Sequence, residues 1–258
     1  MLFHRVVLSA LLVGALSGLL LSAVQRWQVI PIIDAAERFE QARTPQAVEP
    51  ARGEVQAHDH GAHVHSATAW EPAEGAERIG FTVLSNVLTA AGFALIMLVA
   101  MAAALRRRDT ATQRKAAARL DWRYGLLWGL AGYAVFFVAP ALGLPPEIPG
   151  AEAAPLESRQ LWWMLTVACT AVGLTGAAFC KSPWRWTALA LLVVPYLVGA
   201  PHLGASAFAE YPPAAAAEMT ELAKRFVWAT AITNGVFWIV LGALSGWAAQ
   251  RFVRKAVA

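Results

Sequence analysis

Histidines are concentrated in one short polar stretch of the sequence. Residues 58–65 read HDHGAHVH, and the chain of 258 residues has only two other histidines, His4 and His202. Imidazole is a common ligand of divalent transition metals, and His-rich tracts are typical of metal binding. The alternative is a soluble loop that is merely rich in histidine. We expect a divalent cation to be bound by His58, Asp59, His60, His63 and His65.

The loop does not encode the identity of its metal. Its spacing is too close and irregular for a pre-formed tetrahedral zinc site of the finger type. A flexible loop can still wrap two or three imidazoles around Co²⁺, Ni²⁺, Cu²⁺ or Zn²⁺, and the near-absence of external Cys and Met argues against Cu⁺. Because only neutral imidazole binds metal, binding should weaken below about pH 6.

A second pair of candidate ligands lies in proline-rich segments. His202 follows Pro201 in VVPYLVGAPH, and Glu147 lies in GLPPEIPG. Each follows an apolar segment at its predicted outer end. Glu147 and His202 are therefore predicted to form a second metal station below the loop, with a plain interfacial histidine as the alternative.

Polar residues at membrane depth are the candidates for an ion pathway. Asn86 lies eight residues after Arg78, and Asn234 lies nine after Arg225. At 1.5 Å per residue, both are about 12–13 Å inside a hydrocarbon layer of about 30 Å. Ser85 and Thr233 are their hydroxyl neighbours. The alternative is that all four residues simply bond one helix to another.

The elements that carry these residues are apolar. Hydrophobic residues make up 58% of the chain and charged residues 15%, against about a quarter charged in an ordinary soluble protein, and the mean hydropathy is +0.49. Windows of about 20 apolar residues predict membrane-spanning helices. We expect an all-α, polytopic membrane helix bundle in a single domain, with about six spans at 6–24, 79–105, 124–144, 161–180, 186–201 and 226–250.

The distribution of charge predicts the topology. With six spans, the inside segments hold 13 basic and 2 acidic residues, and the outside segments hold 8 basic and 15 acidic. This is the bias of the positive-inside rule. Both termini are then cytoplasmic, and loop 25–78 is external. The first span could pass for a signal peptide, but its apolar run is longer than the usual signal core and Leu21 stands where a cleavage site prefers a small residue, so we expect it to stay uncleaved. The expected location is a bacterial inner (plasma) membrane with the His-rich loop periplasmic or extracellular.

Two further patterns concern packing. Pro31 opens a predicted helix over 31–42, with Ile32, Ile33, Ala36 and Phe39 on one face. Glycines four residues apart let helix backbones approach closely in lipid. This spacing occurs at Gly14/Gly18, Gly125/Gly129 and Gly242/Gly246.

The sequence lacks the catalytic motifs of several enzyme classes. It contains no GxSxG elbow, HExxH motif or Walker-type glycine loop. No histidine lies at the centre of a predicted span, so a bis-histidine haem has no ligands. We expect no enzyme, no permanently bound cofactor and no nucleic-acid partner.

The order of several segments resembles the CbtA family. They are FHRVVLSALLVGALSGLLLS, QRWQVIPII, WEPAEGAERIGFTVLSNVLTAAGFAL, GLLWGLAGYAVFFVAPALGLPPEIPG, SRQLWW, VVPYLVGAPH and TNGVFWIVLGALSGW. The resemblance implies a subunit of a cobalt transporter that serves cobalamin synthesis. It also implies a small single-span, histidine-bearing partner (CbtB-like). The family is usually described with five spans, against six counted here.

The leading hypothesis is therefore uptake of a divalent metal. Co²⁺ is favoured, with Ni²⁺ or Zn²⁺ possible. One alternative is a non-transporting metal-binding or scaffold subunit of a membrane complex, and another is a metal exporter. These hypotheses differ in whether the polar residues at mid-depth face a common water-filled path.

Overall fold

The computed structural model describes residues 2–43, 72–73, 75–106, 121–180, 183–204 and 206–253, and the His-rich loop lies outside them. The elements over these residues are all helices, as the sequence predicts. In chain order they are α1 (Leu2–Gln28), α2 (Ile30–Arg43), α3 (Ala76–Arg106), α5 (Trp122–Tyr133), η1 (Ala134–Val138), α6 (Ala139–Gly143), α7 (Leu156–Phe179), α8 (Trp184–Ala190), α9 (Val194–Val198), α10 (Pro213–Ala248) and η2 (Ala249–Val253).

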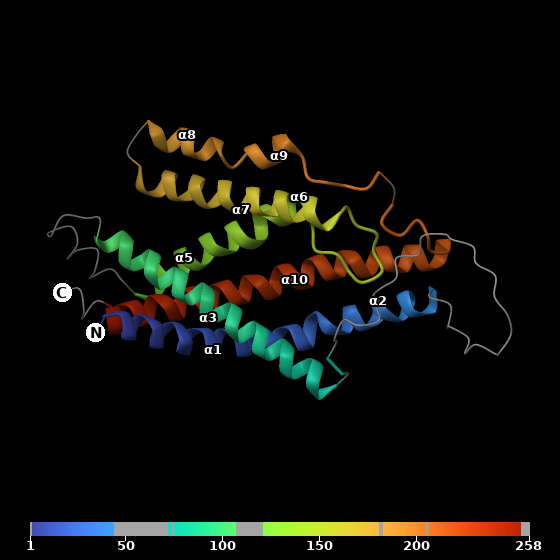
Figure 1. Ribbon diagram of the computed structural model, residues 1–258, viewed down its shortest axis with the longest axis horizontal. Helices are drawn as coiled ribbons and strands as arrows, with labels where there is room; N and C mark the ends of the chain where they lie inside the picture. Colours follow the sequence, from blue (N-terminus) through green and yellow to red (C-terminus); the bar gives the residue numbers. More distant parts are fainter. Residues whose placement is uncertain are drawn as a thin grey trace, which may run out of the picture.

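The helices run back and forth along one long axis (Figure 1). α1 contacts both α10 and η2, so the first and last described helices meet at the same end of the bundle, which we call the terminal end. The opposite end, called the loop end, holds α2, residues 144–155 and residues 199–212 apart from 205.

Five helical stretches in the described chain are long and apolar enough to cross a membrane. They are His4–Gln28, Ala76–Ala104, Trp122–Gly143, Leu156–Phe179 and Pro213–Arg251. The remaining predicted span corresponds to Trp184–Val198, a shorter apolar pass that is broken between α8 and α9. As a helix this pass would reach about 22 Å, less than the hydrocarbon layer of about 30 Å. It still carries the chain back to the loop end, where α10 begins (Figure 1).

Small residues hold the centre of the bundle together. A Cβ atom placed on Gly18 of α1 would lie 2.5 Å from the Cα atom of Val87 in α3. A Cβ atom on Gly242 of α10 would lie 2.5 Å from the carbonyl oxygen of Gly125 in α5. Both distances are far below van der Waals contact. The glycine spacing therefore marks true backbone contacts between α1 and α3 and between α5 and α10.

The third pass contains a π-helical turn that the sequence analysis did not predict. The N–H of Ala139 donates to the carbonyl of Ala134, five residues back, and Pro140 follows directly. Proline has no N–H, so a helix must rearrange its hydrogen bonds around it. Within this turn, Phe136 stacks on Trp238 of α10, with ring centroids 5.5 Å apart. The wider turn thus places an aromatic ring against α10.

A second hydrophobic core lies at the loop end. The 36 residues of α10 reach about 54 Å, well beyond the hydrocarbon layer of about 30 Å, and its first turns pack on α2 (Figure 1). We call α2, residues 144–154, residues 206–212 and the first turns of α10 the cap. Its core consists of Val29, Ala36, Ile148, Phe208, Tyr211, Met219 and Phe226.

The cap confirms the predicted apolar face of the helix over 31–42. Ala36 is fully buried, and Ile32, Ile33 and Phe39 pack against the same core. Arg43, at the end of α2, pairs with Glu210 at 2.7 Å, and its guanidinium lies 5.0 Å from the ring centroid of Tyr211. α2 is thereby fixed to the segment that leads into α10.

Candidate metal-binding site

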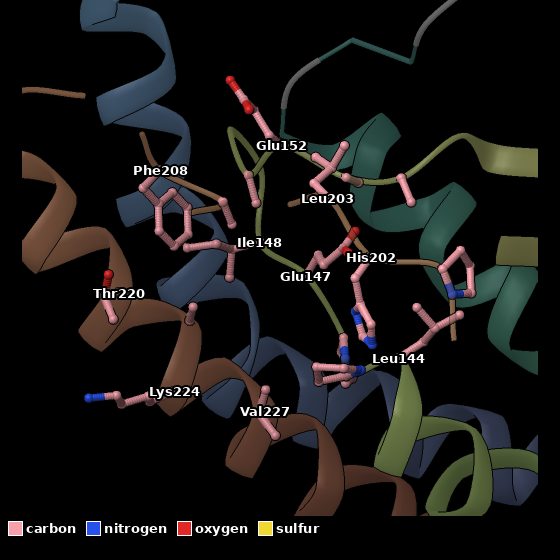
Figure 2. Close-up of a pocket in the computed structure, with 18 residues that line it drawn as sticks. Leu144, Glu147, Ile148, Glu152, His202, Leu203, Phe208, Thr220, Lys224 and Val227 are labelled. Atoms are coloured by element: carbon pink, nitrogen blue, oxygen red, sulfur yellow. The ribbon is translucent and has the colours of Figure 1, made fainter. Parts of the chain in front are cut away.

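A cavity of about 390 Å³ lies where the cap meets the bundle. Its wall combines residues 144–154, the segment around Pro201–Leu203, Phe208 and one face of α10 from Thr220 to Val227 (Figure 2). Most of the lining is apolar, including Leu144, Ile148, Leu203, Phe208 and Val227. A few polar groups in such a lining are the usual pattern of a small-ligand site.

Glu147 and His202 both line this cavity, although they are far apart in the sequence (Figure 2). Proline restricts the backbone just before each of them. Pro145 and Pro146 precede Glu147, and Pro201 precedes His202. The structure therefore places both predicted ligands in the wall of one cavity at the loop end.

Two hydrogen bonds fix the pass that leads to His202. The indole N–H of Trp162 in α7 donates to the carbonyl of Pro195 at 3.0 Å. The hydroxyl of Tyr196 donates to the carbonyl of Ala139 at 2.7 Å. α9 is thus attached to both neighbouring passes, although it has only five residues.

Glu147 and His202 alone would not form a complete metal-binding cage. Among the described residues, no group of three or more His, Cys, Asp or Glu side chains is placed to hold a metal. Glu152 also lines the cavity, but Figure 2 shows its carboxylate directed away from His202. A cation held by one carboxylate and one imidazole would keep water in its remaining positions, as suits a transient station.

Glu147 has a counter-ion that the sequence analysis did not assign to it. Its Oε2 atom lies 2.5 Å from Nη2 of Arg159, in the first turns of α7, and the two side chains are 32% and 30% exposed. Arg159 appears in the sequence only as a basic residue at the start of an apolar segment. No local pattern links it to a glutamate in the preceding loop.

Lys224, a cation in the cavity wall, is turned toward a different partner. Nζ of Lys224 lies 2.7 Å from Oε1 of Glu221, one turn earlier in α10. This hydrogen bond and the charge of Lys224 lower the pKa of Glu221. Figure 2 shows Lys224 pointing away from Glu147 and His202. Lys224 is thus paired outside the region of the candidate ligands.

The polar residues predicted at mid-depth lie outside this cavity, and one of them, Asn86, makes bonds that join two helices. The amide of Asn86 donates to Oγ of Ser22 at 3.0 Å and to Oε1 of Gln25 at 2.6 Å, joining α3 to α1. The amide of Asn234 donates to the carbonyl of Thr230 in its own helix at 2.9 Å. Thr233 is buried and Ser85 is exposed.

The structure describes no side chain of the His-rich loop, so its five candidate ligands stay predictions. The chain enters α3 from the loop side at Gly75, whose φ of 87° lies in the left-handed region. Arg78, in the first turn of α3, binds Glu37 of α2 with Nη2 and Oε1 2.6 Å apart. The entry point of α3 is therefore fixed to the cap.

Large apolar side chains are exposed along the long helices, including Leu8, Leu88, Leu127, Leu161 and Ile232. With five helices long enough to span, this surface defines a multi-pass helical membrane protein. The family model described as "Probable cobalt transporter subunit (CbtA)" matches residues 3–250. The chain therefore belongs to the CbtA family. No curated protein and no solved structure matches it.

Proposed function

We propose that this protein is the membrane subunit through which a divalent transition metal, with Co²⁺ favoured, enters the cell for cobalamin synthesis. The observation that carries the proposal is the cavity at the loop end. Glu147 and His202 both line it, in a chain whose family is described as a cobalt transporter subunit. A carboxylate and an imidazole suit Co²⁺, and they also suit Ni²⁺ and Zn²⁺.

The proposed route begins at the His-rich loop, residues 58–65. Its imidazoles capture the ion from the outer solution and release it to the cavity. The proposed topology has six spans and both termini in the cytoplasm of a bacterial inner membrane, which puts the cap and its cavity outside. The acidic excess of the outside segments raises the local concentration of cations there.

A second candidate function is favoured by Asn86 and Asn234. Their amides already bond to neighbouring helices or to their own backbone. In this alternative the chain captures metal, and a partner supplies the passage. The family description as a subunit implies a partner, which we propose to be a small single-span protein that carries histidine.

Uptake into proteoliposomes that contain only the purified chain separates the two functions. Labelled Co²⁺ would be offered outside, with Zn²⁺ and Ni²⁺ as competitors. Saturable uptake would make this chain the permease. Binding of Co²⁺ without uptake would make it a capture subunit, and uptake should then appear when the partner is added. Loss of metal from preloaded vesicles, without uptake, would contradict import.

The role of the loop has its own test. Replacing His58, His60, His63 and His65 with Asn should slow uptake when metal is scarce and spare it when metal is in excess. His4→Asn is the matched control, because it removes one imidazole at the terminal end. Equal loss at every metal concentration would contradict the capture role.

A further inference from the structure

Glu147 is occupied by Arg159 in this structure, and the two side chains approach to 2.5 Å. The same carboxylate lines the cavity that holds His202. A cation that binds Glu147 and His202 together must therefore compete with the guanidinium. Both partners of the ion pair are about one-third exposed, so the competition takes place in a partly desolvated site.

Arg159 reaches Glu147 from the other side of the loop segment. Leu144, Pro145 and Pro146 line the metal cavity on one side and a neighbouring cavity of about 560 Å³ on the other. Arg159 lines only the second of these cavities. Glu147 thus lies between a guanidinium on one side and an imidazole-bearing cavity on the other.

We propose that Arg159 is a positioning residue that holds Glu147 while the cavity is empty and is displaced when Co²⁺ binds. This inference rests on the proposed function, because it assigns a role to the same cavity. The side chain of Glu147 is 32% exposed, so its charge without a counter-ion would carry a partial desolvation cost. Free, this carboxylate would bind a dication tightly and release it slowly. A resident guanidinium lowers the affinity, and its return to Glu147 assists release of the metal.

The competing explanation is a purely structural ion pair that ties α7 to residues 144–155. The two roles predict opposite effects on metal affinity. A structural tie, once removed, loosens the cavity and weakens binding. A competing cation, once removed, leaves Glu147 free and strengthens binding.

The experiment uses the full-length chain with His58, His60, His63 and His65 replaced by Asn, so that the loop contributes no imidazole. Co²⁺ alone is the probe, and its binding is measured by calorimetry and by equilibrium dialysis. The variants are Arg159→Gln and Arg159→Lys. Arg78→Gln is the matched control, because it breaks an ion pair of similar length and exposure at the loop end outside the metal cavity.

Arg159→Gln should bind Co²⁺ about two- to fivefold more tightly, the range given by partly exposed ion pairs. Arg159→Lys should lie between it and the parent, and Arg78→Gln should match the parent. In uptake assays, Arg159→Gln should lower both the half-saturating Co²⁺ concentration and the maximal rate. A structural defect would raise the half-saturating concentration instead.

Unchanged or weaker binding by folded Arg159→Gln would overturn the inference while leaving the metal cavity in place. If Arg159→Gln does not fold, Arg159→Lys decides the same question through its affinity. A different outcome is that the parent does not bind Co²⁺ and behaves like its Glu147→Gln and His202→Ala variants. The cavity would then have no part in the proposed function, and Arg159 would have no metal to compete with.

Discussion

Replacing Asn86 with Leu should destabilise the contact between α1 and α3. The Asn86 amide donates to Ser22 and Gln25 of α1, and leucine of similar size makes neither bond. Hydrogen bonds between helices in membranes average about 0.6 kcal/mol. Loss of both should therefore lower the free energy of unfolding by about 1.2 kcal/mol. If Gln25 keeps an unpaired amide oxygen in lipid, the loss should be larger.

Unfolding in mixed micelles of mild detergent and dodecyl sulfate, followed by far-UV circular dichroism, measures this loss. Asn234→Leu is the control, because its amide bonds only to Thr230 of the same helix. It should cost no more than about 0.6 kcal/mol. A double-mutant cycle between Asn86→Leu and Gln25→Ala isolates the bond across the helices, for which a coupling of about 0.6 kcal/mol is expected.

The result that would refute this reasoning is a stable Asn86→Leu variant with impaired metal uptake. Unchanged unfolding together with a lower maximal uptake rate would make Asn86 a residue of the ion pathway. A coupling energy near zero in the cycle would equally show that the bond to Gln25 contributes nothing to stability.

Three other perturbations test separate features. Gly242→Ala should separate α10 from α5 at Gly125 and cost about 1–3 kcal/mol of unfolding free energy, whereas Gly204→Ala, with open space around it, should cost little. Trp162→Phe removes the donor to the Pro195 carbonyl, so it should lower the unfolding free energy by about 1 kcal/mol and speed proteolysis near α9. Co²⁺ binding by the loop histidines should fall as the pH drops below about 6, because protonated imidazole cannot bind metal. A pH-independent affinity in calorimetry would exclude these ligands.

The helices were predictable because their apolar length is a property of the local sequence. The apolar face of residues 31–42 and the glycine contacts followed from helical periodicity in the same way. The start of α10 was harder to predict, because a search for apolar windows begins at Phe226. The helix itself begins at Pro213, where a proline at the first position and an alanine-rich run were the available signals.

The contacts of the site could not be derived from the sequence. The prolines next to Glu147 and His202 predict rigid segments at the ends of two passes. Nothing in the local sequence shows that both residues line one cavity. The pairing of Glu147 with Arg159 and of Asn86 with Gln25 depends on how helices pack in three dimensions. Periodicity places a residue on a helix face without identifying what lies opposite.

The π-helical turn at Ala134–Val138 sets the orientation of everything that follows it in this pass. Each residue of an α-helix advances the chain by about 100°, so deleting one residue here would restore α-helical pairing and rotate α6 by that amount. Leu144 and Glu147 would then leave the wall that they share with His202. One additional residue in the third pass thus determines which side chains of the following segment face the candidate site.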